Sequence, residues 1–151
     1  MTEIKDSELP NNPVEAQGML IKAFYMKFGK DALPLIREIC GKQGRALGLK
    51  IKKKLPDTKL TTVAKAFAQT YDPSEVKIVS LSEDQFRIRG TACPFGLENT
   101  SRELCEAVME IDCEYFRAAV SDKINLTITS TIAAGDSYCE ASYMIGEEKK
   151  K

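Results

Sequence analysis

The spacing of the apolar residues changes near residue 73, and this change limits what the chain can fold into. Before that point, apolar side chains such as Val14, Ile21 and Phe28 recur at the interval of helix turns, which marks one buried helix face. Later, in segment 124–132, apolar and polar residues alternate, which is typical of a strand with one buried face. The sequence therefore predicts a helical first half and a second half that contains strands.

The first half contains signals for three helices. Pro13 suits the first position of a helix, and Gly29 suits the position just after the last turn. The second helix carries Gly41, Gly44 and Gly48, although Gly inside a helix costs roughly 1 kcal/mol relative to Ala. This ladder of glycines indicates that another helix or a ligand approaches closely. The expected helices cover about 13–28, 31–53 and 60–70.

The second half combines strands with one further helix. Thr100 and Glu103 form a capping-box pattern, which predicts a helix from about residue 100 to 120. The expected strands cover 76–81, 85–89, 124–132 and 139–145. Short turns join them in pairs, so they are expected to form one antiparallel sheet. The predicted fold is α+β with the order α-α-α-β-β-α-β-β, a four-stranded antiparallel sheet with helices packed on it.

The length of 151 residues suits one domain with its own core. We expect a flexible polar leader over residues 1–12, a single domain over 13–146, and a charged tail over 147–151. No apolar run approaches about 18 residues, so no membrane span is expected. The 22 basic and 22 acidic residues cancel, which argues against a dedicated nucleic-acid or membrane binder.

The chain contains no histidine, and this absence restricts its chemistry. It excludes a Ser-His-Asp triad, a Cys-His pair and metal or haem ligation by histidine. Any reaction must use thiols, carboxylates, lysines, tyrosines or a bound cofactor. The odd number of cysteines, five, without an export signal predicts reduced thiols in the cytoplasm. Cys40 fits the apolar stripe of the second helix and is expected to be a core thiol.

The helix expected over 100–120 carries an unusual second stripe beside its core face. The stripe combines a thiol, a thioether, a carboxylate and an aromatic ring, from Cys105, Met109, Asp112 and Phe116. A carboxylate on such an apolar stripe needs a partner. The Cys105 and Asp112 positions are about 10 Å apart along the helix, so they can face a common ligand. We therefore consider this stripe ligand-binding, with Asp112 as a candidate proton carrier.

The other candidate residues lie on either side of this helix. Cys93 precedes it, and exposed N–H groups at a helix start favour a thiolate. Cys93 is therefore either a reactive thiol or an ordinary loop cysteine. Asp136 and Cys139 are either ligand contacts or parts of a turn and a strand core. Cys113 lies at the edge of the same surface.

These thiols are also candidate metal ligands. Cys93, Cys105, Cys113 and Cys139 could converge through the fold and hold zinc or an iron–sulfur cluster. No C-x-x-C pair supports such a site.

The second half resembles the L-2-amino-thiazoline-4-carboxylic acid hydrolase-like family. The resemblance rests on Cys93-Pro94, on Cys105 with Asp112 seven residues later, and on the G-D-x-x-C motif that ends at Cys139. The chain is more distantly similar to vinyl-reductase-type small-molecule-binding domains. Met109 departs from the family pattern, because a second helical cysteine is typical at that position.

The resemblance leaves two functions open. The first is a cysteine-dependent hydrolase that opens a thiazoline or similar C=N compound, with Cys93 as nucleophile or metal ligand and Asp112 handling protons. The second is a non-catalytic domain that carries or senses a small molecule or a metal in a pocket between helices and sheet. A homodimer is an additional expectation.

Overall fold

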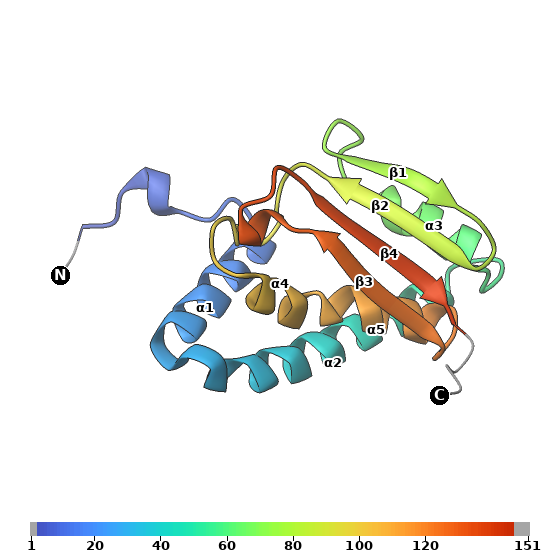
Figure 1. The fold of residues 1–151 in the computed structure, drawn as a ribbon, viewed down its shortest axis with the longest axis horizontal. Coiled ribbons are helices and arrows are strands. Elements are labelled where there is room, and N and C mark those ends of the chain that lie inside the picture. Colours follow the sequence, from blue (N-terminus) through green and yellow to red (C-terminus); the bar gives the residue numbers. More distant parts are fainter. Residues whose placement is uncertain (1–2, 147–151) are drawn as a thin grey trace.

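The computed structural model describes residues 3–146 and has the predicted α+β architecture. A four-stranded sheet forms one side of the molecule, and all main helices lie on its other side (Figure 1). The predicted tail over 147–151 lies outside the described residues. The helices are α1 (Pro13–Phe28), α2 (Leu33–Lys52), α3 (Leu60–Ala68), α4 (Arg102–Val108) and α5 (Glu110–Ala119). The strands are β1 (Val76–Leu81), β2 (Gln85–Gly90), β3 (Ile124–Ser130) and β4 (Cys139–Ile145).

The sheet has the strand order β1-β2-β4-β3, and every neighbouring pair is antiparallel. β4 therefore lies between β2 and β3 and joins the β1–β2 pair and the β3–β4 pair into one sheet. β3 ends at Ser130 rather than at residue 132, because the pairing shifts between Ile128 and Ser130. A short 3₁₀ turn, Ile132–Ala134, follows and is capped by Thr131.

The helix expected over 100–120 is two helices, α4 and α5, which meet at Met109. The predicted capping box was also wrong. Ser101 caps α4 by accepting the N–H of Leu104 at 3.1 Å. Glu103 is engaged elsewhere, because its carboxylate accepts the hydroxyl of Tyr25 at 2.7 Å.

The glycine ladder of α2 packs against the backbone of α5, as the sequence predicted. A Cβ atom added to Gly44 would overlap the carbonyl oxygen of Ile111, and one added to Gly48 would overlap that of Tyr115. α2 therefore lies on the outer side of α5, at backbone contact (Figure 1). The other side of α5 faces the sheet.

An aromatic cluster joins α3 and α5 to the inner face of the sheet. The Phe116 ring lies 4.6 Å from the Tyr143 ring, and the Phe86 and Tyr143 rings are stacked at 5.5 Å between centroids. All three side chains are fully buried. Large aromatic rings of this kind contribute much of the burial energy of a small core.

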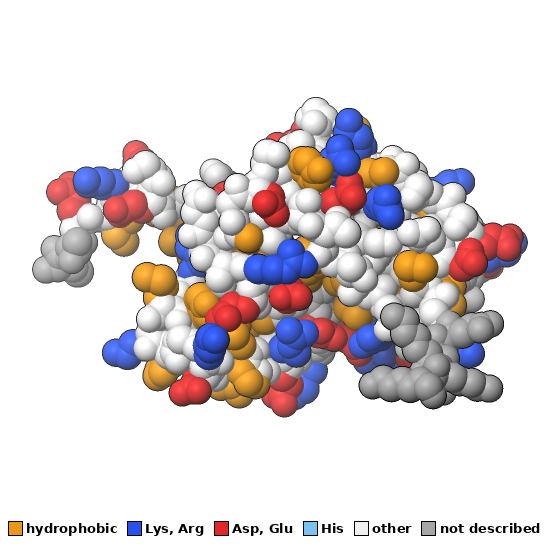
Figure 2. All heavy atoms as spheres, in the orientation of Figure 1, with side chains coloured by type: hydrophobic (Ala, Val, Ile, Leu, Met, Phe, Trp, Pro, Cys, Tyr) orange, Lys and Arg blue, Asp and Glu red, His pale blue; other side chains and the backbone are white. Residues whose placement is uncertain are grey.

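On the face shown in Figure 2, acidic and basic side chains are interspersed rather than segregated by sign. Within residues 3–146, no helix combines the length and the apolar character needed to cross a membrane.

We expect Gly44→Ala to destabilise the fold by at least about 2 kcal/mol, because α5 cannot stay at backbone contact and overpacking outweighs the gain in helix propensity. Gly41→Ala is the matched control, since its Cβ would meet only the flexible side chains of Glu110 and Glu114, at 3.3 and 3.6 Å from their Cγ atoms. Urea unfolding of both variants measures the effect. Equal stabilities for the two variants would contradict this account of the α2–α5 contact.

Candidate functional site

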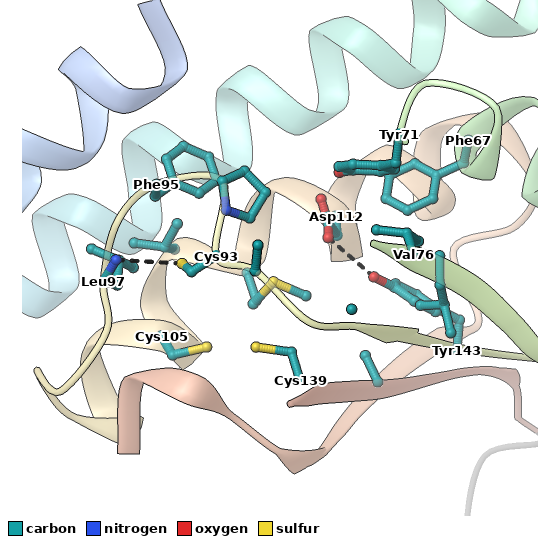
Figure 3. A pocket seen from close by; sticks show the side chains of 17 residues that line it. Phe67, Tyr71, Val76, Cys93, Phe95, Leu97, Cys105, Asp112, Cys139 and Tyr143 are labelled. Atoms are coloured by element: carbon teal, nitrogen blue, oxygen red, sulfur yellow. Dashed lines mark hydrogen bonds between the residues drawn. The ribbon is translucent and has the colours of Figure 1, made fainter. Parts of the chain in front are cut away.

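A cavity of about 120 Å³ lies between α3, α4, α5, the inner face of the sheet and the loop of residues 91–97. Most of its lining is apolar. Its polar groups are gathered at two ends, with thiols at one end and Asp112 with tyrosine hydroxyls at the other (Figure 3). We call this space the thiol cavity.

Three cysteines from separate parts of the chain form the thiol end. Cys93 comes from the loop, Cys105 from α4 and Cys139 from the first residue of β4. Figure 3 shows the sulfur atoms of Cys105 and Cys139 pointing toward each other. The Cys93 sulfur accepts the N–H of Leu97 at 3.4 Å, and the Cys139 sulfur accepts that of Ile132 at 3.3 Å. All three are free thiols.

Burial keeps two of these thiols protonated at neutral pH. Burial raises the pKa of Cys105 to about 11 and also raises the pKa of Cys93, although backbone N–H groups of Leu97 and Phe95 act in the opposite direction. The N–H groups that contact Cys93 belong to its own loop and not to the first turn of α4. The thiolate favoured by a helix start, as the sequence suggested, is therefore opposed by desolvation.

Helix α1 holds the loop that carries Cys93. Gly18 touches the backbone of Phe95, where any Cβ would overlap the Phe95 carbonyl group. The ammonium group of Lys22 donates to the carbonyl oxygen of Gly96 at 3.1 Å. These two contacts fix the loop from outside, so Cys93 is placed by the helical half of the chain.

Asp112, on α5, provides the charge at the other end. Its carboxylate accepts the hydroxyl of Tyr143, on β4, at 3.1 Å. Burial raises the pKa of Asp112 to about 6, and the Tyr143 hydrogen bond acts in the opposite direction. The side chain is surrounded by protein atoms, and the surface that it keeps faces cavities. The pKa of Tyr71 is also raised, first by burial and then by the nearby charge of Asp112.

The structure brings together most of the residues that the sequence singled out. The five that line the thiol cavity are Cys93, Cys105, Met109, Asp112 and Cys139.

The structure places the other three candidates outside this cavity. Phe116 is fully buried in the aromatic cluster, because one turn past Asp112 the rings of Phe86 and Tyr143 pack against α5. Asp136 holds the turn before β4 by accepting the N–H of Thr131 at 2.9 Å. Cys113 is buried among Glu110, Glu114 and Arg117 and contacts the backbone of Leu126.

The four-cysteine ligand set is therefore incomplete. Among residues 3–146, no three or more Cys, Asp or Glu side chains are arranged to hold a metal ion. Cys113 contacts the backbone of Leu126 on β3 instead of lining the thiol cavity, so it does not join the other three cysteines. The donors present do not fit zinc or an iron–sulfur cluster.

Two cavity tyrosines were not among the sequence-based candidates. Tyr143 belongs to the strand expected over 139–145, but its hydrogen bond to Asp112 joins positions 31 residues apart. Tyr71 follows α3 and carried no pattern that pointed to Asp112. Only the tertiary packing of α3 and β4 around α5 reveals this group.

The sequence matches the family described as L-2-amino-thiazoline-4-carboxylic acid hydrolase over residues 14–143. The chain belongs to this family. The family resemblance inferred from Cys93-Pro94 and the G-D-x-x-C motif is thereby confirmed. None of the curated proteins matches the chain.

The fold is also found among solved structures. One similar structure is subunit 3 of a trafficking protein particle complex from Naegleria fowleri, covalently bound to palmitic acid. Its TM-score is 0.58 at 13% identity, and the match covers 92% of this chain and 98% of that one. At this identity the likeness concerns the fold.

We expect the stability of Asp112→Asn relative to the natural protein to depend on pH. The pKa of Asp112 is raised from 3.8 to about 6 in the folded state, so the folded protein holds a proton that the unfolded chain releases. The natural protein therefore loses stability as the pH rises from 4 to 6, by roughly 3 kcal/mol if the shift is fully expressed. The Asp112→Asn variant has no ionisable group at this position, so its unfolding free energy does not fall for this reason.

Urea unfolding at pH 4 and pH 7 measures this prediction. The difference in unfolding free energy between variant and natural protein should move in favour of Asp112→Asn at the higher pH. A difference that is independent of pH would contradict the burial of an ionisable Asp112. Because both proteins share every other carboxylate, the comparison isolates this one.

Proposed function

We propose that this chain binds a small, largely apolar molecule in the thiol cavity. The observation that supports this proposal best is the lining itself, which is apolar except for the thiols at one end and Asp112 with its tyrosines at the other. Pockets with mostly apolar walls and a few placed polar groups are typical ligand sites. The polar end would orient the ligand, and the apolar walls would supply most of the affinity.

The polar end accepts and donates hydrogen bonds in one place. Asp112 can accept from an N–H or O–H group of the ligand, and the Tyr71 hydroxyl can donate to an acceptor. Tyr143 already donates to Asp112 and holds the carboxylate in position. A neutral or weakly basic nitrogen group is the kind of ligand group that suits this end.

The solved structure with the same fold gives independent support. That protein is covalently bound to palmitic acid, so a protein with this fold can carry a molecule with a long apolar chain. The family description adds a small heterocyclic compound as a second class. Both are compatible with a cavity between helices and sheet.

Hydrolysis of a C=N compound is the second candidate, and one observation favours it. The Cys93 sulfur accepts N–H groups from its own loop, which stabilise negative charge on sulfur. In such a reaction the Cys93 thiol would release its proton to water and its sulfur would form a bond to the carbon, while the C=N electron pair moves to nitrogen and nitrogen takes the proton of the Asp112 carboxyl group. Water would then form a bond to this carbon as the carbon–sulfur bond to Cys93 breaks, with its proton passing to the Asp112 carboxylate and a solvent proton returning to the sulfur. Breakage of the carbon–nitrogen bond, with transfer of the new hydroxyl proton to nitrogen, would give the carbonyl compound and the amine.

We also propose a cytoplasmic location and a homodimer. The five cysteines are all free, which suits a reducing compartment. Leu20 and Met26 of α1 are 72% and 82% exposed, and two copies could cover them. Light scattering of the purified protein measures the number of copies.

Binding in the thiol cavity can be measured with N-phenyl-1-naphthylamine, a neutral dye that becomes fluorescent in apolar sites. We expect saturable binding, and at least about a tenfold loss in Ala92→Phe, because Ala92 lines the cavity and a ring there occupies it. Ala46→Phe is the control, on the exposed part of α2. Equal binding by both variants, or none by the natural protein, would contradict the proposal.

Thiol reactivity separates the two candidate functions. With iodoacetamide at pH 7, we expect Cys93 and Cys105 to react at least about tenfold more slowly than free cysteine, because burial keeps them protonated. Mass spectrometry of the peptides assigns each rate, and the urea-unfolded protein shows that all thiols can react. A Cys93 that reacts faster than free cysteine, with loss of the fast phase in Cys93→Ser, would instead favour the hydrolase.

A further inference from the structure

A second cavity, of about 450 Å³, adjoins the thiol cavity. It lies between α2, α3 and α5, on the other side of the Pro94–Phe95 segment. Five residues line both cavities and so form a common wall: Phe67, Tyr71, Pro94, Phe95 and Asp112. A molecule in the second cavity therefore touches the same groups as a molecule in the thiol cavity.

Two lysines at the C-terminal end of α2 line the second cavity. Lys50 is in the last turn of the helix and Lys54 lies two residues past its end, and both are exposed. Neither forms an ion pair with an acidic group among residues 3–146. Lys52 and Lys53, between them, do not line the cavity.

The cavity is polarised along its length. Leu47 and Ile51 supply apolar walls next to the lysines, and Ile111 supplies another on α5. Leu47 is 44% exposed, which is a large exposure for an apolar side chain beside two cations. Asp112 lies at the common wall, where its carboxylate would repel an anion. An anionic group is therefore favoured at the lysines and an apolar body toward the common wall.

We propose that the second cavity is the outer part of the ligand site and binds the anionic end, such as a carboxylate, of an elongated apolar ligand. The ligand would place its anionic group between the ammonium groups of Lys50 and Lys54 and its apolar body along Leu47, Ile51 and the common wall. This inference rests on the proposed binding function and specifies the class of ligand. It also gives a role to the basic end of α2.

The experiment measures displacement of N-phenyl-1-naphthylamine by two competitors of equal chain length, dodecanoate and dodecan-1-ol. The double variant Lys50→Gln/Lys54→Gln is compared with Lys52→Gln/Lys53→Gln, which removes the same charge from the same helix end. We expect the first variant to lose about five- to tenfold in dodecanoate affinity, as expected for two partly exposed ion pairs. Its affinity for dodecan-1-ol should not change.

The control variant should bind both competitors as the natural protein does. Equal loss of dodecanoate affinity in both variants would show a general charge effect and overturn the assignment to Lys50 and Lys54. Unchanged affinity in both would overturn it as well, while dye binding and displacement by dodecan-1-ol would still uphold the proposed function. Absence of dye binding in the natural protein would overturn the proposed function, and this inference with it.

Discussion

The backbone contact between α2 and α5 is the constraint on which the site depends. Gly44 and Gly48 let the α5 backbone lie directly on α2, so the opposite side of α5 is presented to the sheet. Asp112 lies on α5 between Ile111 and Cys113, and its direction follows from that helix position. A side chain larger than hydrogen at either glycine would move α5 and with it the only carboxylate that lines the thiol cavity within residues 3–146.

A carboxylate in such a place is costly for the fold. Burial of a charged group without full compensation costs several kcal/mol, and here one tyrosine hydrogen bond offsets part of that cost. Part of the penalty is avoided by protonation, since the pKa of Asp112 is raised to about 6. A carboxyl group with a pKa of about 6 is mostly ionised at pH 7 but keeps a protonated fraction of roughly one tenth, so it can both accept and donate a proton. Groups perturbed in this way are concentrated at functional sites.

Local patterns predicted the elements of this fold well. The spacing of Val14 and Ile21, the alternation in 124–132 and the glycine ladder are local signals, and each corresponds to an observed helix, strand or helix contact. The break at Met109 was missed because α4 and α5 share one apolar periodicity, and no Pro or Gly marks their junction.

The site was predictable only in part, because several of its residues come from elements that are far apart in the sequence. Cys105, Met109 and Asp112 share one helical stripe, which local spacing reveals, and they do line one cavity. Phe116 continues that stripe one turn further along α5, but there the rings of Phe86 and Tyr143 pack against it, so it belongs to the aromatic core. Tyr71 and Tyr143 come from other elements, so their meeting with Asp112 depends on tertiary packing.

The chain contains no histidine, and this absence limits what the thiols of the cavity can catalyse. In a site without imidazole, a thiol of raised pKa has no adjacent base to accept its proton, and the Asp112 carboxylate, with a pKa of about 6, is a poor acceptor for the proton of the Cys93 thiol, whose pKa burial raises. The apolar walls of the cavity also raise the free energy of every charged intermediate, because such an intermediate would be desolvated there. The same walls and neutral thiols favour an uncharged ligand body. The features that oppose thiolate catalysis are therefore the ones that support binding, and a catalytic role would require the ligand itself to supply the missing base.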